Sequence, residues 1–127
     1  MVCDAMIRVL GIGFRTVIEP QSLLRFAQAF GPVDLLATSA QKAGEDIAQE
    51  LARALGVGLV AVAPHAIRAQ PTPSVSPRIM ARFGTGSLAE AAALVAAGPR
   101  AGLLQFRQVS PCGRATGAVA EGQGVDG

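Results

Sequence analysis

The chain has 127 residues, half of them aliphatic, aromatic or cysteine, which is enough to bury one hydrophobic core but not two. Its formal net charge is only +2, its basic residues are dispersed along the sequence, and it has no tryptophan or tyrosine for base stacking, so nucleic-acid binding is disfavoured. No apolar run approaches the roughly 18 residues of a membrane span. We therefore predict a single domain over residues 1–120, not in a membrane, followed by a flexible tail at 121–127.

The N-terminal segment, MVCDAMIR, has neither a basic leader nor a separate apolar segment, so we expect no signal peptide and a cytoplasmic location. Cys3 and Cys112 lack the spacing of a zinc site or a redox pair, and no cluster of potential ligands indicates a metal. We expect free thiols, no bound metal and no cofactor. A catalytic cysteine would need a base beside it, and the sequence does not place the single histidine, His65, next to either cysteine.

Residues 6–15, MIRVLGIGFR, form an apolar run that ends in two glycines and an arginine. They predict a buried strand opening into a turn, because Gly11 and Gly13 can adopt positive φ or admit a ligand close to the backbone. Ligands of open α/β sheets gather beyond the carboxyl ends of the strands, and Arg15 adds a guanidinium there. An anion site and a turn that only packs strand against helix explain this spacing equally well. A dinucleotide site is a lesser alternative, because Thr16 replaces the third glycine of G-x-G-x-x-G.

Residues 20–30 repeat apolar side chains at the i, i+3, i+4, i+7 spacing and predict a helix with Pro20 at its first position. Gly31 and Pro32 end this helix. Residues 33–38 then predict a second strand.

A polar turn over residues 38–42 follows at the carboxyl end of that strand. It carries Thr38 and Lys42, and its position makes Lys42 a candidate binding residue. The alternative is a solvated lysine at a helix start. Glu45 and Asp46 fit the first turn of the next helix, where acidic side chains complement the helix dipole.

Residues 45–55 predict a helix that Gly56 ends, and residues 59–63 then predict a strand. His65 directly follows the strand. It is either a proton carrier near neutral pH or a surface loop residue. The proline-rich residues 69–77, AQPTPSVSP, predict a loop that crosses a sheet edge or lies over the crevice.

Residues 76–83 predict a short helix. Ser87 and Glu90 then match the S-x-x-E capping box at the start of an alanine-rich helix, in which each side chain satisfies a backbone amide. The start of this helix, at Thr85, Gly86 and Ser87, can also receive an anion, and the two roles are compatible.

Strands over residues 103–106 and 115–120, joined by a turn at 110–114, complete the chain. The order of elements predicts an α/β fold, a three-layer α/β/α sandwich with a mostly parallel or mixed sheet of about five strands. The last two strands are candidates for antiparallel pairing.

Three signatures occur in order: G-I-G-F-R at residues 11–15, L-A-T-x-x-x-K-x-x-E at 36–45 and G-T-G-S-L-A-E-A-A-A-L at 84–94. With A-T-x-A-V-A at 115–120, they resemble the cobalamin-biosynthesis family that comprises the stand-alone protein CobE and the C-terminal domain of CbiG. The resemblance implies a three-layer α/β/α domain and a place in corrin-ring assembly. The short chain looks like the stand-alone type. The implied partner is a precorrin or hydrogenobyrinic-acid-like intermediate, bound by a carrier, chaperone or accessory to the pathway enzymes.

A macrocycle with many acetate and propionate groups needs several separated donors, which arginine, lysine and helix N-termini supply. By analogy with the family, we place eight residues around one crevice: Gly11, Gly13, Arg15, Thr38, Lys42, Thr85, Gly86 and Ser87.

Phe14 stands where the family often has cysteine, which favours binding over covalent catalysis, and no catalytic residue is assigned. Two alternatives stay open. One is an enzyme that transforms a precorrin, with Lys42, His65 or Glu90 moving protons. The other is a phosphate- or nucleotide-binding regulatory domain outside the pathway.

Overall fold

The central strand of the molecule is β1 (Ile7–Phe14). In the computed structural model, which describes residues 6–124, β1 pairs in parallel with β2 (Leu35–Ser39) and antiparallel with β5 (Ala115–Gly122). β3 (Gly58–Val62) extends the parallel side and β4 (Gly102–Val109) the antiparallel side, so the spatial order is β3-β2-β1-β5-β4. The predicted mixed sheet of five strands, with an antiparallel last pair, is confirmed.

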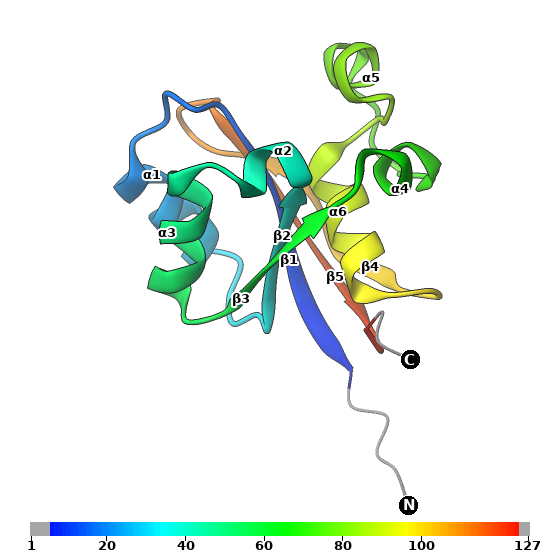
Figure 1. The fold of residues 1–127 in the computed structure, drawn as a ribbon, viewed down its shortest axis with the longest axis horizontal. Helices are drawn as coiled ribbons and strands as arrows, with labels where there is room; N and C mark the ends of the chain where they lie inside the picture. The colour runs from blue at the N-terminus through cyan, green and yellow to red at the C-terminus, as the bar shows by residue number, and fades with distance from the viewer. Residues whose placement is uncertain (1–5, 125–127) are drawn as a thin grey trace, which may run out of the picture.

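Helices cover both faces of this sheet (Figure 1). Within the described residues they are α1 (Pro20–Gln28), α2 (Ala40–Ala43), α3 (Asp46–Leu55), α4 (Pro64–Ala69), α5 (Pro77–Phe83) and α6 (Leu88–Ala97). α1 and α3 pack on one face, and α6 packs on the other with α4 and α5 beside it. The predicted three-layer α/β/α sandwich is confirmed. None of the described helices combines the length and the apolar character needed to cross a membrane.

β1 contributes to two hydrophobic cores because helices cover both of its faces. Leu10 and Ile12 pack against α1 and α3 through residues such as Leu23 and Leu51. On the other face, Val9 packs against the alanines of α6. This double burial is why the strand reads as a continuous apolar run rather than as an alternating pattern.

Gly11 lies where α6 crosses β1. A Cβ at this position would lie 2.0 Å from the carbonyl oxygen of Ala89, so any side chain would force the helix away from the sheet. The prediction that Gly11 and Gly13 form a turn is therefore wrong. Both lie inside β1 without positive φ, because β5 pairs with β1 as far as Phe14.

Two further boundaries differ from the sequence prediction. α4 begins at Pro64, and the exposed His65 lies in its first turn rather than in a loop, because proline suits a first helical position. β5 continues two residues past position 120, and the backbone N–H of Gly124 donates to the carbonyl of Ala97 at 2.8 Å. Cys3 and the last three residues of the expected tail lie outside the described residues.

Candidate ligand-binding site

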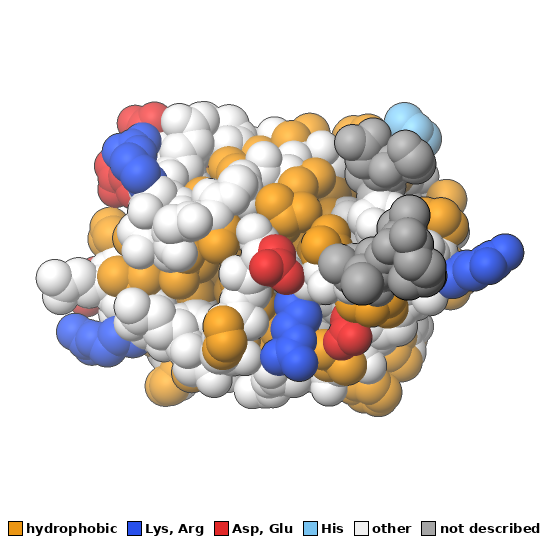
Figure 2. Space-filling model, turned by 90° about the horizontal axis from the view of Figure 1, so that it is seen from below, with side chains coloured by type: hydrophobic (Ala, Val, Ile, Leu, Met, Phe, Trp, Pro, Cys, Tyr) orange, Lys and Arg blue, Asp and Glu red, His pale blue; other side chains and the backbone are white. Residues whose placement is uncertain are grey.

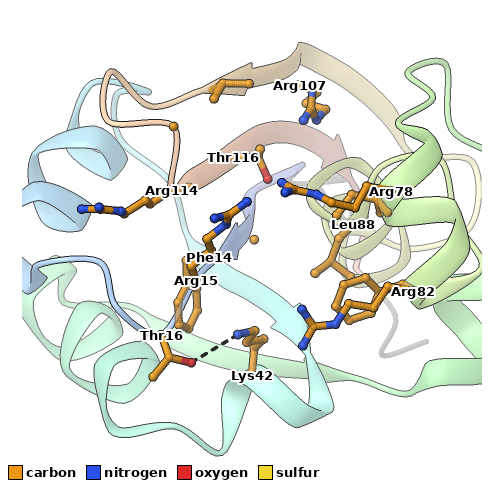
Figure 3. Close-up of a pocket in the computed structure, with 16 residues that line it drawn as sticks. Phe14, Arg15, Thr16, Lys42, Arg78, Arg82, Leu88, Arg107, Arg114 and Thr116 are labelled. Atoms are coloured by element: carbon orange, nitrogen blue, oxygen red, sulfur yellow. Dashed lines mark hydrogen bonds between the residues drawn. The ribbon is translucent and has the colours of Figure 1, made fainter.

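A cavity of about 570 Å³ lies at the end of the sheet where β1 ends (Figure 3). Its basic lining residues come from five separate segments and are Arg15, Lys42, Arg78, Arg82, Arg107 and Arg114. These are six of the eleven lysines and arginines in the sequence. No aspartate or glutamate occurs among the described residues that line the cavity. The fold therefore gathers basic residues that are dispersed along the chain.

The opposite end of the molecule differs in charge. Figure 2 views the molecule from the end at which β1 begins, and its basic and acidic side chains are intermingled there. Arg8 and Glu121 form an ion pair of 4.0 Å at this end. Among the described residues, the cavity thus gathers six basic side chains in a lining that holds no acidic one.

Arg15 and Arg114 reach the cavity through the end of the β1–β5 pair. The backbone N–H of Arg15 donates to the carbonyl of Arg114 at 2.9 Å, which joins the residue after β1 to the turn before β5. Both side chains are exposed and free to contact a ligand. Gly13, Ala115 and Thr116 also line the cavity.

Lys42 is held at the cavity by α2. The hydroxyl of Ser39 accepts from the backbone N–H of Lys42 at 3.3 Å and caps this helix. The ammonium lies 3.5 Å from a carboxylate oxygen of Glu45, 3.5 Å from the hydroxyl of Thr16 and 5.1 Å from the ring centroid of Phe14. Because the residue is only 7% exposed, the alternative of a solvated lysine is wrong.

Arg78 and Arg82 enter from α5. They are four residues apart and therefore share one face of the helix, which also presents Ile79 and Phe83 to the cavity. Ser76 caps the helix, and its hydroxyl accepts from the backbone N–H of Ile79 at 3.5 Å. The i, i+4 spacing of these two arginines is a signal in the sequence that indicates a basic helix face, and the sequence prediction did not use it.

The cavity also has an apolar wall. Its large apolar side chains are Phe14, Ile79, Phe83, Leu88 and Val109. An apolar wall beside several cations suits a ligand with a hydrophobic body and carboxylates or phosphates at its edge.

The structure separates the residues that the sequence placed around one crevice. Gly13, Arg15 and Lys42 line the cavity, whereas Gly11 lies under α6. Thr38 is not on a polar turn: it is fully buried in β2, and its hydroxyl donates to the carbonyl of Ile12 at 2.7 Å.

The other three candidates lie at the start of α6. Thr85 and Gly86 line a second cavity of about 320 Å³ on the side of Arg68. Ser87 is buried, and its hydroxyl accepts from the backbone N–H of Glu90 at 3.2 Å. Half of the predicted capping box is thus present. The other half is not, because the carboxylate of Glu90 bonds to Ser74 and to the backbone of β4 instead.

Sequence reasoning missed the four other cations of the main cavity: Arg78, Arg82, Arg107 and Arg114. The last two lie on β4 and on the turn that follows it, and no local pattern marks them as neighbours of the end of β1. Neither His65 nor Glu90 lines this cavity. Among the described residues, no group of three or more His, Cys, Asp or Glu side chains is placed to hold a metal ion.

The family profile described as "Cobalamin synthesis G C-terminus" matches residues 8–120. The chain belongs to this family. The resemblance inferred from the sequence motifs is confirmed, and the chain is a cobalamin-biosynthesis protein of the group that includes CobE and the C-terminal domain of CbiG.

Solved structures agree with this family membership. The crystal structure of CobE, a protein from the cobalamin (vitamin B12) biosynthetic pathway, is 28% identical with a TM-score of 0.76, over 91% of this chain and 93% of CobE. Cobalamin biosynthesis protein chiG from Agrobacterium tumefaciens is 35% identical with a TM-score of 0.67, over 90% of this chain and 97% of chiG.

A more distant structure shares the fold alone. A putative cobalamin biosynthesis protein G homolog from Sulfolobus solfataricus is 18% identical with a TM-score of 0.68, over 91% of this chain and 37% of the homolog. A search of curated proteins found none that matches the chain. In this member of the family, the position after the second glycine of G-x-G is Phe14, whose ring lies beside Lys42.

Proposed function

We propose that the protein binds a polycarboxylate tetrapyrrole intermediate of cobalamin biosynthesis in the basic cavity and acts as a carrier, chaperone or accessory to the pathway enzymes. The observation that carries the proposal is the set of six cationic side chains around an apolar wall, with no acidic side chain among the described lining residues. Membership of the cobalamin-biosynthesis family supplies the class of ligand.

The electrostatics favour a ligand with several separated negative charges. Like-charged groups in one concave site raise the local potential and attract a counter-charged ligand from solution. Arginine adds directional recognition, because its planar fork can bind both oxygens of a carboxylate. Five of the six cations are arginines, and they enter from different sides of the cavity (Figure 3). A corrinoid bears its acetate and propionate groups around its rim, so its charges are distributed in the same way.

The shape of the site supports a bound macrocycle. A volume of about 570 Å³ falls within the range of roughly 300–1,000 Å³ that is typical of small-molecule sites. The side chains of Ile79, Phe83 and Leu88 offer an apolar surface against which the face or edge of a ring can pack.

The lining supports binding more than catalysis. It contains no histidine or carboxylate that could accept a proton, within the part of the chain that the structure describes. Lys42 is the one lining residue with an amine, and its ammonium is held by Glu45 at 3.5 Å. His65 and Glu90, the other two groups considered for proton transfer, lie outside the cavity lining.

A spectral titration tests the proposal. Hydrogenobyrinic acid added to the protein is expected to show a shifted visible spectrum that saturates at one ligand per chain. Its methyl ester is the matched control, because it keeps the macrocycle and loses the negative charges. Unchanged spectra with the acid and with earlier precorrins at high micromolar concentration would refute the proposal.

Two further measurements separate the alternative functions. A changed ligand mass after incubation would indicate an enzyme instead of a carrier. Thermal stabilisation by nucleotides but not by corrinoids would indicate a regulatory domain, because a ligand that binds only the native state raises its apparent stability.

A further inference from the structure

Glu90 is a buried carboxylate that does not belong to the cavity lining. It lies in the first turn of α6 and is 0% exposed. A buried charge is costly unless hydrogen bonds or opposite charges compensate it. Neither of the two ion pairs found among the described residues involves Glu90, so its compensation comes from hydrogen bonds and from the N-terminal end of the helix dipole.

Three donors bind this carboxylate, and all come from other segments. One oxygen of Glu90 accepts from the backbone N–H of Ser74 at 2.9 Å. The other oxygen accepts from the hydroxyl of Ser74 at 2.8 Å and from the backbone N–H of Arg107 at 2.9 Å. Hydrogen bonds to a charged acceptor are stronger than those between neutral groups. Glu90 therefore ties two distant parts of the chain to the start of α6.

The first of these parts leads into α5. Ser74 lies three residues before this helix, and the N–H of Ser76 donates to the carbonyl of Gly86 at 2.7 Å close by. α5 itself contains no buried residue and stands out from the body of the molecule (Figure 1). Only the partly buried Ile79 and Phe83 of α5 pack against the core, so the anchoring of the preceding segment also sets where α5 and its Arg78 and Arg82 lie.

The second part is an irregular stretch of β4. The pairing of β4 with β5 changes register between Gln105 and Gln108, and Arg107 lies within that irregularity. Its N–H bonds to Glu90 instead of to a neighbouring strand. Irregularities of this kind commonly redirect a side chain beside a functional site. Here the redirected side chain is that of Arg107, which lines the cavity.

We propose that Glu90 is a positioning residue of the ligand site: its carboxylate holds α5 and the irregular stretch of β4 in the arrangement that brings Arg78, Arg82 and Arg107 to one cavity. The ligand-binding part of this inference rests on the proposed function. A carboxylate is required because both of its oxygens face N–H or O–H donors. An amide would turn an NH₂ group toward the backbone N–H of Ser74 or of Arg107 and lose that bond.

The substitution Glu90→Gln tests the anchoring directly, because it preserves the size of the side chain. Backbone amide hydrogen exchange across residues 72–83 and 105–109 is expected to accelerate in this variant without any ligand. Glu50→Gln is the matched control, since Glu50 is an exposed carboxylate on α3, and it is expected to leave exchange in both segments unchanged. If Glu90→Gln does not fold, Ser74→Ala, which removes one of the three donors, is expected to accelerate exchange across 72–83 to a smaller degree.

The effect on binding is then measured by titration with hydrogenobyrinic acid. Glu90→Gln is expected to weaken binding about tenfold. The loss of binding free energy in Glu90→Gln should not add to the loss in Arg82→Ala, because Arg82 is already misplaced in the first variant. It should add fully to the loss in Lys42→Ala, because α2 holds Lys42 independently of Glu90. A loss that came only from general destabilisation would add equally to both, and that result would overturn the positioning role.

The two arms separate failure of this inference from failure of the proposed function. If the parent protein does not bind hydrogenobyrinic acid, the proposed function is contradicted. Faster amide hydrogen exchange in Glu90→Gln would still support the anchoring of α5 and β4. Unchanged exchange in both segments would overturn the role of Glu90, whether or not the parent protein binds the acid.

Discussion

Lys42 shows how one residue can be both part of the fold and part of the site. Its ammonium is nearly buried, contacts Glu45 and Thr16, and lies beside the ring of Phe14, yet the residue lines the cavity. Arg15 also lines the cavity and is exposed. An anionic ligand can therefore meet one buried and one exposed cation at the end of β1.

Replacing either cation should weaken ligand binding. Arg15→Ala and Lys42→Ala are each expected to cost about 1.5–3 kcal/mol of binding free energy, or about ten- to a hundredfold in Kd, if each side chain donates to a carboxylate. Arg53→Ala is the control, because it removes one positive charge from α3, away from the cavity. Titration with hydrogenobyrinic acid measures the three Kd values, and parental binding by both cavity variants would show that the site has been misplaced.

Cys112 gives a pH-dependent property that can be measured without a ligand. A hydrogen bond with the Ser110 hydroxyl, at 3.3 Å, is the main cause that lowers the pKa of this exposed thiol, and contacts with Arg114 act in the same direction. A lowered pKa means that the reactive thiolate forms at lower pH. In a Cys3→Ser background, the rate of alkylation by iodoacetamide should therefore rise with pH around a midpoint below that of a cysteine peptide. Ser110→Ala should move this midpoint upward, and a midpoint equal to that of the peptide would refute the expectation.

At the scale of elements, the decisive contact is the close crossing of α6 over β1. Alanine side chains on the helix and Gly11 on the strand leave little between the two backbones. This crossing also brings the first turn of α6, with Glu90 and Leu88, to the end of the sheet where the cavity lies. The packing of one helix thus sets both the core and the back of the site.

Gly11→Ala should disturb this crossing. The added Cβ would lie 2.0 Å from the Ala89 carbonyl, which is backbone and cannot rotate away. We expect a loss of about 2–3 kcal/mol in the free energy of unfolding, measured by urea denaturation. Gly102→Ala is the matched control on β4, since a Cβ there meets nothing within 4 Å, and it should change stability by less than about 1 kcal/mol. Equal stability of the two variants would mean that α6 tolerates a wider spacing.

At the scale of the whole molecule, charge is distributed unevenly. Six cations gather at one end of the sheet, whereas basic and acidic side chains are intermingled at the other end (Figure 2). The small net charge of +2 conceals this polarity. A ligand with several negative charges should therefore be drawn to one end of the molecule.

Salt should weaken binding if this distribution drives it. The affinity for hydrogenobyrinic acid is expected to fall by roughly tenfold between about 0.05 and about 0.5 M ionic strength, because counter-ions screen exposed charges. The salt dependence should be smaller for Arg15→Ala than for the parent protein. Binding that does not respond to salt would indicate that the apolar wall, rather than the arginines, supplies most of the affinity.

Local patterns in the sequence determined most of the secondary structure and the family. Several features depend on residues within a few positions of one another. They are the buried run of β1, the start of α1 at Pro20, the end of α5 at Gly84 and the capping of α6 by Ser87. Such signals can be read from one segment without knowing its neighbours. The family profile matches residues 8–120, the range in which these signals lie.

The site was predictable only in part, because a sequence does not show which residues of distant segments meet. Arg15 and Lys42 were found because both follow parallel strands, whose carboxyl ends share one edge of the sheet. Arg107 and Arg114 reach that edge through antiparallel pairing of β5 with β1. The carboxylate of Glu90 does not cap its own helix as predicted, because it accepts hydrogen bonds from donors on two other segments. The amino-acid sequence by itself thus determined the elements, their order and the family. Only the tertiary structure decided which charges share a cavity, because that depends on long-range strand pairing and helix packing.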